Sequence, residues 1–107
     1  MENKIEYEIK ENVTIVYFFG EIDSHNVVSY RNKLNMILAL NDNDVIFHFQ
    51  ETTFIDSAGV GLVLGRYQQL LKEGRKLSLC ALSKTAYKVF ELSGLFEIMD
   101  YLKEVKV

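Results

Sequence analysis

Residues 45–67, VIFHFQETTFIDSAGVGLVLGRY, predict a strand, a loop and a helix in succession. Residues 45–49 are apolar on both faces apart from His48, which is typical of a central strand covered on both sides. Residues 51–56 predict a loop, and residues 57–72 carry apolar side chains at helical spacing. A buried strand that leads into a long helix is the repeating unit of an α/β fold.

The segment before this unit predicts a β-hairpin. Residues 5–9 alternate in polarity, and residues 13–19 are rich in β-branched and aromatic side chains. Residues 20–23, GEID, are expected to leave the sheet and lead into the first helix.

Each predicted helix has a polar residue that can cap its first turn, because a side-chain oxygen can accept a hydrogen bond from a free backbone N–H there. Gly74 and Gly94 follow two of the helices, where a left-handed backbone ends a helix at little cost. The candidate caps are Asp23 or Ser24 for a helix ending near Asn41, Ser57 for a helix ending near Lys72, and Ser83 for a helix ended by Gly94.

Two further strands are expected, at residues 76–81 and 97–101, which gives the order β-β-α-β-α-β-α with a final strand. This order predicts a single α/β domain over residues 1–107. Its sheet is expected to be mixed and mostly parallel, with four or five strands, an N-terminal β-hairpin and three or four helices packed against it.

The composition limits the classes of function. The 107 residues are 49% hydrophobic and 25% charged, with a net charge of −3 and one cysteine, Cys80, which we interpret as a small buried hydrophobe. The basic residues are scattered, which argues against direct nucleic-acid binding. Neither a signal peptide nor an apolar run near the ~20 residues of a membrane span is visible, so we expect a cytoplasmic protein without membrane contact.

Residues 54–67 do not match three known motifs of enzymes or nucleotide-binding proteins. Gly59, Gly61 and Gly65 have the wrong spacing for a dinucleotide fingerprint, and no lysine follows them as a P-loop requires. A serine hydrolase elbow needs a glycine where Ile55 stands. On spacing alone, Ser57 is interpreted equally well as a residue that only caps its helix.

The three glycines require an explanation of their own, since each costs roughly 1 kcal/mol against alanine inside a helix. Close packing of the helix on the sheet would explain them. A partner protein lying flat on an uncluttered helix would explain them equally well.

Four blocks of the sequence, spread over essentially the whole chain, resemble the STAS domain of the anti-sigma factor antagonists. DSAGVG at 56–61 is similar to the D-S-[SA]-G-[LV]-G signature of that family, and GEID at 20–23 is similar to its G-E-[LI]-D. LGRY at 64–67 and LSGLF at 92–96 resemble the sporulation branch of the family.

The resemblance implies a partner-switching protein that is not itself an enzyme and needs no cofactor or metal of its own. In that family the serine after the aspartate is the phosphoacceptor, which is Ser57 here, and Ala58 leaves no second hydroxyl beside it. The implied partners are an anti-sigma factor with ATP-dependent serine kinase activity and a serine phosphatase. The implied partner-binding residues are Asp23, Asp56, Ser57, Ala58, Gly59 and Gly61.

Two alternatives remain beside this expectation. One is a STAS-type scaffold or interaction subunit without regulation by phosphorylation. The other is a small hydrolase that uses Ser57 as its nucleophile.

Overall fold

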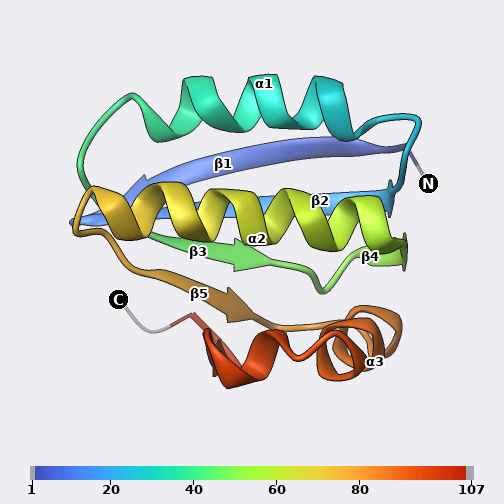
Figure 1. The fold of residues 1–107 in the computed structure, drawn as a ribbon. Helices are drawn as coiled ribbons and strands as arrows, with labels where there is room; N and C mark the ends of the chain where they lie inside the picture. The colour runs from blue at the N-terminus through green and yellow to red at the C-terminus, as the bar shows by residue number, and fades with distance from the viewer. Residues whose placement is uncertain (1, 106–107) are drawn as a thin grey trace.

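The computed structural model describes residues 2–105, which form a single sheet with helices packed against it (Figure 1). Along the chain the elements alternate much as the sequence predicts. They are β1 (Lys4–Lys10), β2 (Val13–Ile22), α1 (Val27–Leu38), β3 (Asp44–His48), β4 (Thr52–Ile55), α2 (Ser57–Lys72), β5 (Leu77–Cys80), α3 (Lys84–Leu92), the 3₁₀ helix η1 (Leu95–Glu97) and β6 (Asp100–Leu102).

The sheet is mixed, and its main path runs β1-β2-β3-β5-β6. The β1–β2 hairpin is antiparallel, with Lys10 opposite Val13 next to the turn, and the other pairings are parallel. The predicted fold class, with its N-terminal hairpin and mostly parallel sheet, is therefore confirmed.

The sequence analysis did not predict one strand, so within the described residues the sheet has six strands and not four or five. Residues 52–55, expected to be a loop, form β4, and residues 20–22, expected to leave the sheet, extend β2 and pair with β4. The register shifts between Gly20 and Glu21, where β2 changes its partner from β3 to β4. Gly20 has φ +82°, and its Cα approaches Asn3 so closely that a Cβ would lie 2.2 Å from Asn3 Oδ1.

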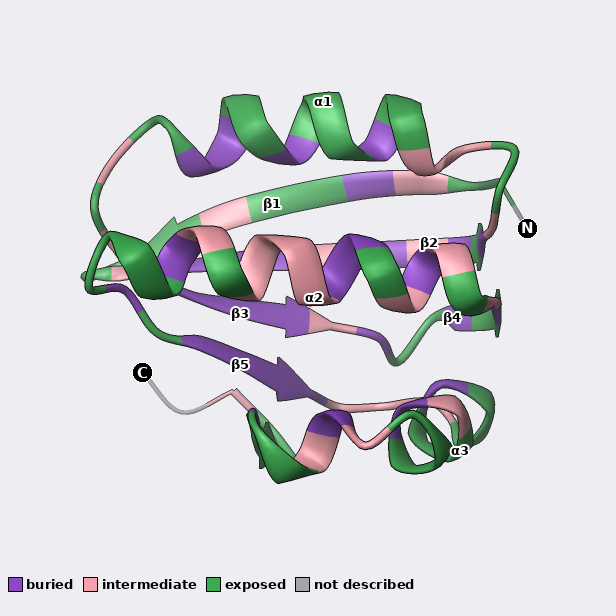
Figure 2. Ribbon diagram, in the orientation of Figure 1, coloured by how far each residue is buried: buried purple, intermediate pink, exposed green. Residues whose placement is uncertain are grey.

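The main core lies between the helices and one face of the sheet. Figure 1 shows α1 and α2 side by side over this face, and Figure 2 shows the buried residues of α1 along the side of the helix nearest the sheet. Phe18 stacks on Phe49 with ring centroids 4.8 Å apart, and Phe49 meets Phe90 of α3 edge-on at 5.0 Å. The aromatic cluster thus joins β2, the end of β3 and α3.

The sequence predicts that the central strand at 45–49 is covered on both faces. β3 is central as expected, but no described helix packs on the opposite face of the sheet. Ile15, Ile46 and Cys80 form a small second cluster, against which Leu102 and Val105 of the C-terminal segment pack. Cys80 is fully buried, in agreement with its interpretation as a small hydrophobe.

Two of the three predicted caps were misplaced. α1 begins at Val27 with Asn26 as its N-cap residue, so neither Asp23 nor Ser24 caps it, and α2 is capped by Asp56 where Ser57 was expected. Ser83 does cap α3, since its side chain accepts from the backbone N–H of Ala86.

Within residues 2–105, the structure contains no helix that is both long and apolar enough to cross a membrane.

Candidate functional site

Ser57 lies where β4 ends and α2 begins. It is the first residue of the 16-residue helix α2, and its side chain is exposed. The first N–H groups of a helix have no partner inside the helix, and they give this end a partial positive charge. A hydroxyl at this position is therefore accessible to another protein and is close to groups that stabilise a negative charge.

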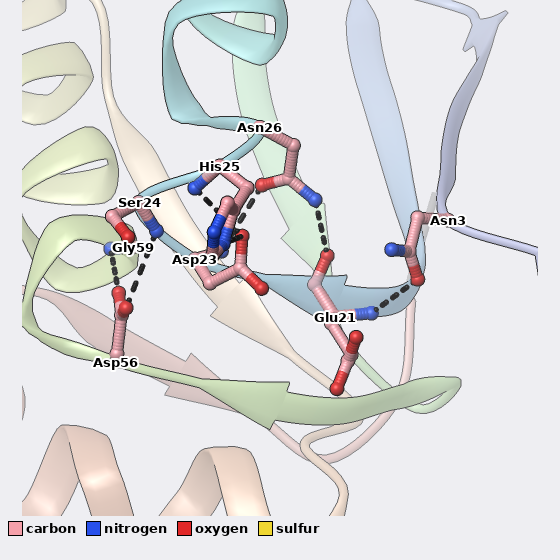
Figure 3. A network of polar contacts seen from close by, with 8 residues as sticks. All are labelled: Asn3, Glu21, Asp23, Ser24, His25, Asn26, Asp56 and Gly59. Carbon is pink, nitrogen blue, oxygen red and sulfur yellow. Dashed lines mark hydrogen bonds and ion pairs between the residues drawn. The ribbon is translucent and has the colours of Figure 1, made fainter.

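Asp56 holds this helix start in place with both oxygens of its carboxylate. Oδ1 accepts a hydrogen bond from the backbone N–H of Gly59 at 3.1 Å, and Oδ2 accepts one from the N–H of Ser24 at 3.3 Å (Figure 3). Its own N–H donates to the carbonyl of Ile22 at 3.2 Å. Asp56 thus connects the start of α2 both to the end of β2 and to the loop that follows β2.

That loop, residues 23–26, is ordered by its own polar network. Asp23 Oδ1 accepts from the N–H of His25 at 2.9 Å, and the N–H of Asp23 donates to Asn26 Oδ1 at 3.0 Å. Asn26 also donates from Nδ2 to the carbonyl of Glu21 at 2.9 Å. Because each of these bonds fixes a backbone group, the loop holds the Asp23 carboxylate, which is 19% exposed, in a defined position.

The glycines of α2 fall into two groups. Gly59 is buried, and a Cβ there would lie 2.6 Å from Ile55 Cγ1 and 2.9 Å from the carbonyl oxygen of Ile22. Close packing of α2 on the ends of β2 and β4 therefore accounts for Gly59. At Gly61 and Gly65 a Cβ would meet nothing within 4 Å, so packing within the described residues does not explain them.

An apolar groove of about 370 Å³ runs along the other side of Ser57, between the start of α2 and helix α3. Val60 and Val89 line it together with Leu92, whose side chain is 77% exposed. An exposed apolar groove next to a hydroxyl and a carboxylate is typical of a surface that contacts another protein.

The structure brings together most of the residues that the sequence singled out. Asp56, Ser57 and Ala58 lie at the start of α2, and the loop that carries Asp23 is bonded to them. Sequence reasoning missed Asn26, which acts through its side-chain amide, and expected Ser24 only as a possible cap, whereas Ser24 acts through its backbone N–H. The only sequence signal for these contacts was the polar run 23–26 itself. A bond from a backbone N–H, such as that of Ser24, cannot be predicted from the type of residue.

Comparison with known proteins places this geometry among characterised folds. A family model described as the STAS domain matches residues 4–106. The anti-sigma F factor antagonist of Lysinibacillus sphaericus is 35% identical over 96 residues, which cover 89% of this chain and 81% of that protein.

Two solved structures of one protein show the same similarity. The anti-sigma factor antagonist SpoIIAA in its unphosphorylated form is 33% identical, covers 94% of this chain and 90% of its own, and superposes with a TM-score of 0.78. The Bacillus cell fate determinant SpoIIAA in the phosphorylated form is likewise 33% identical, with coverages of 94% and 93% and a TM-score of 0.71.

Proposed function

This chain belongs to the STAS domain family, and on that premise we propose that it is an anti-sigma factor antagonist, a regulatory binding protein and not an enzyme. Its unphosphorylated form binds an anti-sigma factor and thereby releases the sigma factor. The observation that carries the proposal is the exposed Ser57 at a helix start, set between an apolar groove and an ordered acidic loop.

We propose further that Ser57 is the phosphoacceptor and that the anti-sigma factor is the kinase. Phosphoryl transfer requires the acceptor to be positioned and the negative charge of the transferred phosphoryl group to be neutralised. Asp56 positions Ser57 through three backbone contacts, while the ATP, the metal ion and the base belong to the kinase. A serine phosphatase then restores the unmodified form.

Phosphorylation acts on the interface in this proposal and leaves the helix intact. The phosphate adds about −1.5 to −2 charges at the end of α2, where the helix dipole favours an anion. The same charge lies on the residue that follows Asp56, whose carboxylate is bonded to the loop that carries Asp23, so an interface that fits the neutral serine becomes strongly acidic. The proposed partner-binding surface contains Asp23, Asp56, Ser57, Ala58 and Gly61, whereas the burial of Gly59 removes it from this surface.

The proposal can be tested with the anti-sigma factors of the source genome, each purified and mixed with this chain and ATP. We expect one of them to bind the chain and to add one phosphate, measured by intact mass. The added mass disappears in Ser57→Ala, and the phosphorylated wild type loses binding about a hundredfold, which corresponds to about 2.7 kcal/mol.

A control variant separates modification from folding. Ser29→Ala removes another exposed hydroxyl, on α1 and outside the residues that line this groove, and should leave both phosphorylation and binding unchanged. Binding without any phosphate gain would favour the alternative, a STAS-type scaffold without regulation by phosphorylation. Absence of binding to every anti-sigma factor would refute the proposed function.

A further inference from the structure

A second groove, on the opposite side of α2 from α3, contains an arginine without a hydrogen-bond acceptor. Arg66 lies in the middle of α2 and is half-buried. Its Nε and Nη1 atoms are buried, and neither finds a hydrogen-bond partner within residues 2–105. Guanidinium donors that are removed from water without an acceptor destabilise a protein, so their presence requires a reason.

A second arginine in the same groove makes the buried positive charge of Arg66 still less favourable. Arg31 of α1 lines the same groove. Burial is the main cause that lowers the pKa of Arg66, and the positive charge of Arg31 lowers it further. Two like charges that line one groove repel each other, and an anion bound between them would offset that repulsion.

The shape of the groove fits a side chain that comes from outside. Its volume is about 290 Å³, and Gly61 and Gly65 form part of its wall. Because a Cβ at either glycine would meet nothing within 4 Å, the backbone of α2 is open to close approach. The groove also reaches Ala58, the neighbour of Ser57, and none of the described residues that line it is acidic.

We propose that this groove binds a carboxylate side chain of the anti-sigma factor, held by the guanidinium groups of Arg66 and Arg31. The inference rests on the proposed function and names a contact within it. An arginine can bind a carboxylate through two parallel N–H···O bonds, formed by Nη2 together with either Nε or Nη1. In Arg66 both Nε and Nη1 are without a partner within the described residues. The apolar lining from Val27 and Leu62 suits the methylene groups of an aspartate or glutamate better than it suits a free phosphate.

The test measures the affinity of Arg66→Gln for the anti-sigma factor that binds the wild type. We expect affinity to fall at least tenfold for Arg66→Gln and by a smaller factor for the more exposed Arg31→Gln. Lys72→Gln removes the same charge from an exposed position at the far end of the same helix, and it should stay within twofold of the wild type. The melting temperature of Arg66→Gln should equal or exceed that of the wild type, because buried donors without acceptors have been removed.

A double-mutant cycle then identifies the ligand. Each acidic residue of the anti-sigma factor is replaced by alanine, and at least one replacement should weaken binding non-additively with Arg66→Gln. Unchanged affinity of Arg66→Gln, or a lowered melting temperature together with lost binding, would overturn the proposal. So would an effect that appears only in the presence of nucleotide, since a phosphate group would then fill the groove.

The same titrations distinguish failure of this inference from failure of the proposed function. If the wild type binds and Arg66→Gln binds equally well, only the carboxylate site is wrong. If the wild type binds no anti-sigma factor, both proposals are wrong.

Discussion

Two glycines of α2 that lie two residues apart have opposite surroundings and should respond oppositely to alanine. In Gly59→Ala the new methyl group would overlap the side chain of Ile55 and the carbonyl of Ile22, a backbone group that cannot easily move. We expect its free energy of unfolding to fall by about 1–3 kcal/mol. In Gly61→Ala the methyl group meets open space, and the free energy of unfolding should rise by about 0.5–1 kcal/mol.

Urea denaturation of the wild type and both variants measures these changes, and Gly61→Ala serves as the matched control for Gly59→Ala. Equal effects at the two positions would mean that α2 does not pack as closely on the strand ends as the structure shows.

At the scale of the single residue, the sequence places the N-cap of α2 to within one position. Asp56 and Ser57 are both good caps, and their order alone does not decide which one precedes the helix. The decision depends on β2, because the N–H of Asp56 donates to the carbonyl of Ile22 and keeps Asp56 in an extended conformation. The N-cap of α1 was equally hard to predict from residue type. Asn26 precedes the helix, but its Oδ1 accepts from the N–H of Asp23 and from no N–H of α1.

At the scale of the element, β4 is the main feature that the sequence did not reveal. Thr52–Ile55 contains residues that favour strands, but its two threonines lie between Glu51 and Asp56 and leave no apolar run. Leu77–Cys80 is equally short and was predicted, because it is apolar apart from one serine. Its formation depends on the extension of β2 beyond Gly20, and this bend is a tertiary feature. The strands and helices of 7–16 residues were predicted because each spans several repeats of its pattern.

Helix α3 offers the test at this scale, because a nine-residue helix depends strongly on its cap. Ser83 Oγ accepts from the N–H of Ala86 at 3.1 Å. We expect Ser83→Ala to lower the free energy of unfolding by about 1 kcal/mol. Hydrogen exchange should increase first in the amides of α3.

Ser93→Ala is the control for Ser83→Ala, since Ser93 follows the same helix and its Oγ only donates to the carbonyl of Phe90 at 3.1 Å. A loss of stability in Ser93→Ala equal to that in Ser83→Ala would contradict a specific role for the N-terminal cap.

At the scale of the whole molecule, the candidate site lies at one end of the sheet and outside the core. Ile22 and Ile55 end the paired strands β2 and β4, and the loop and helix that follow them form the site. The carboxyl ends of parallel strands are where α/β folds place binding sites, because side chains there are not needed for packing. The site can therefore change its charge while the core stays unchanged.

This separation predicts that phosphorylation of Ser57 switches binding without unfolding the protein. This fold matches SpoIIAA in both its unphosphorylated and its phosphorylated form. We expect the melting temperature of the phosphorylated chain to equal that of the wild type or to rise by a few degrees, because an anion at the start of α2 interacts favourably with the helix dipole. Thermal unfolding of wild type, phosphorylated protein and Ser57→Ala, followed by circular dichroism, measures this. A phosphorylated form that melts well below Ser57→Ala would show that the switch acts by loosening α2, and the interface mechanism would have to be abandoned.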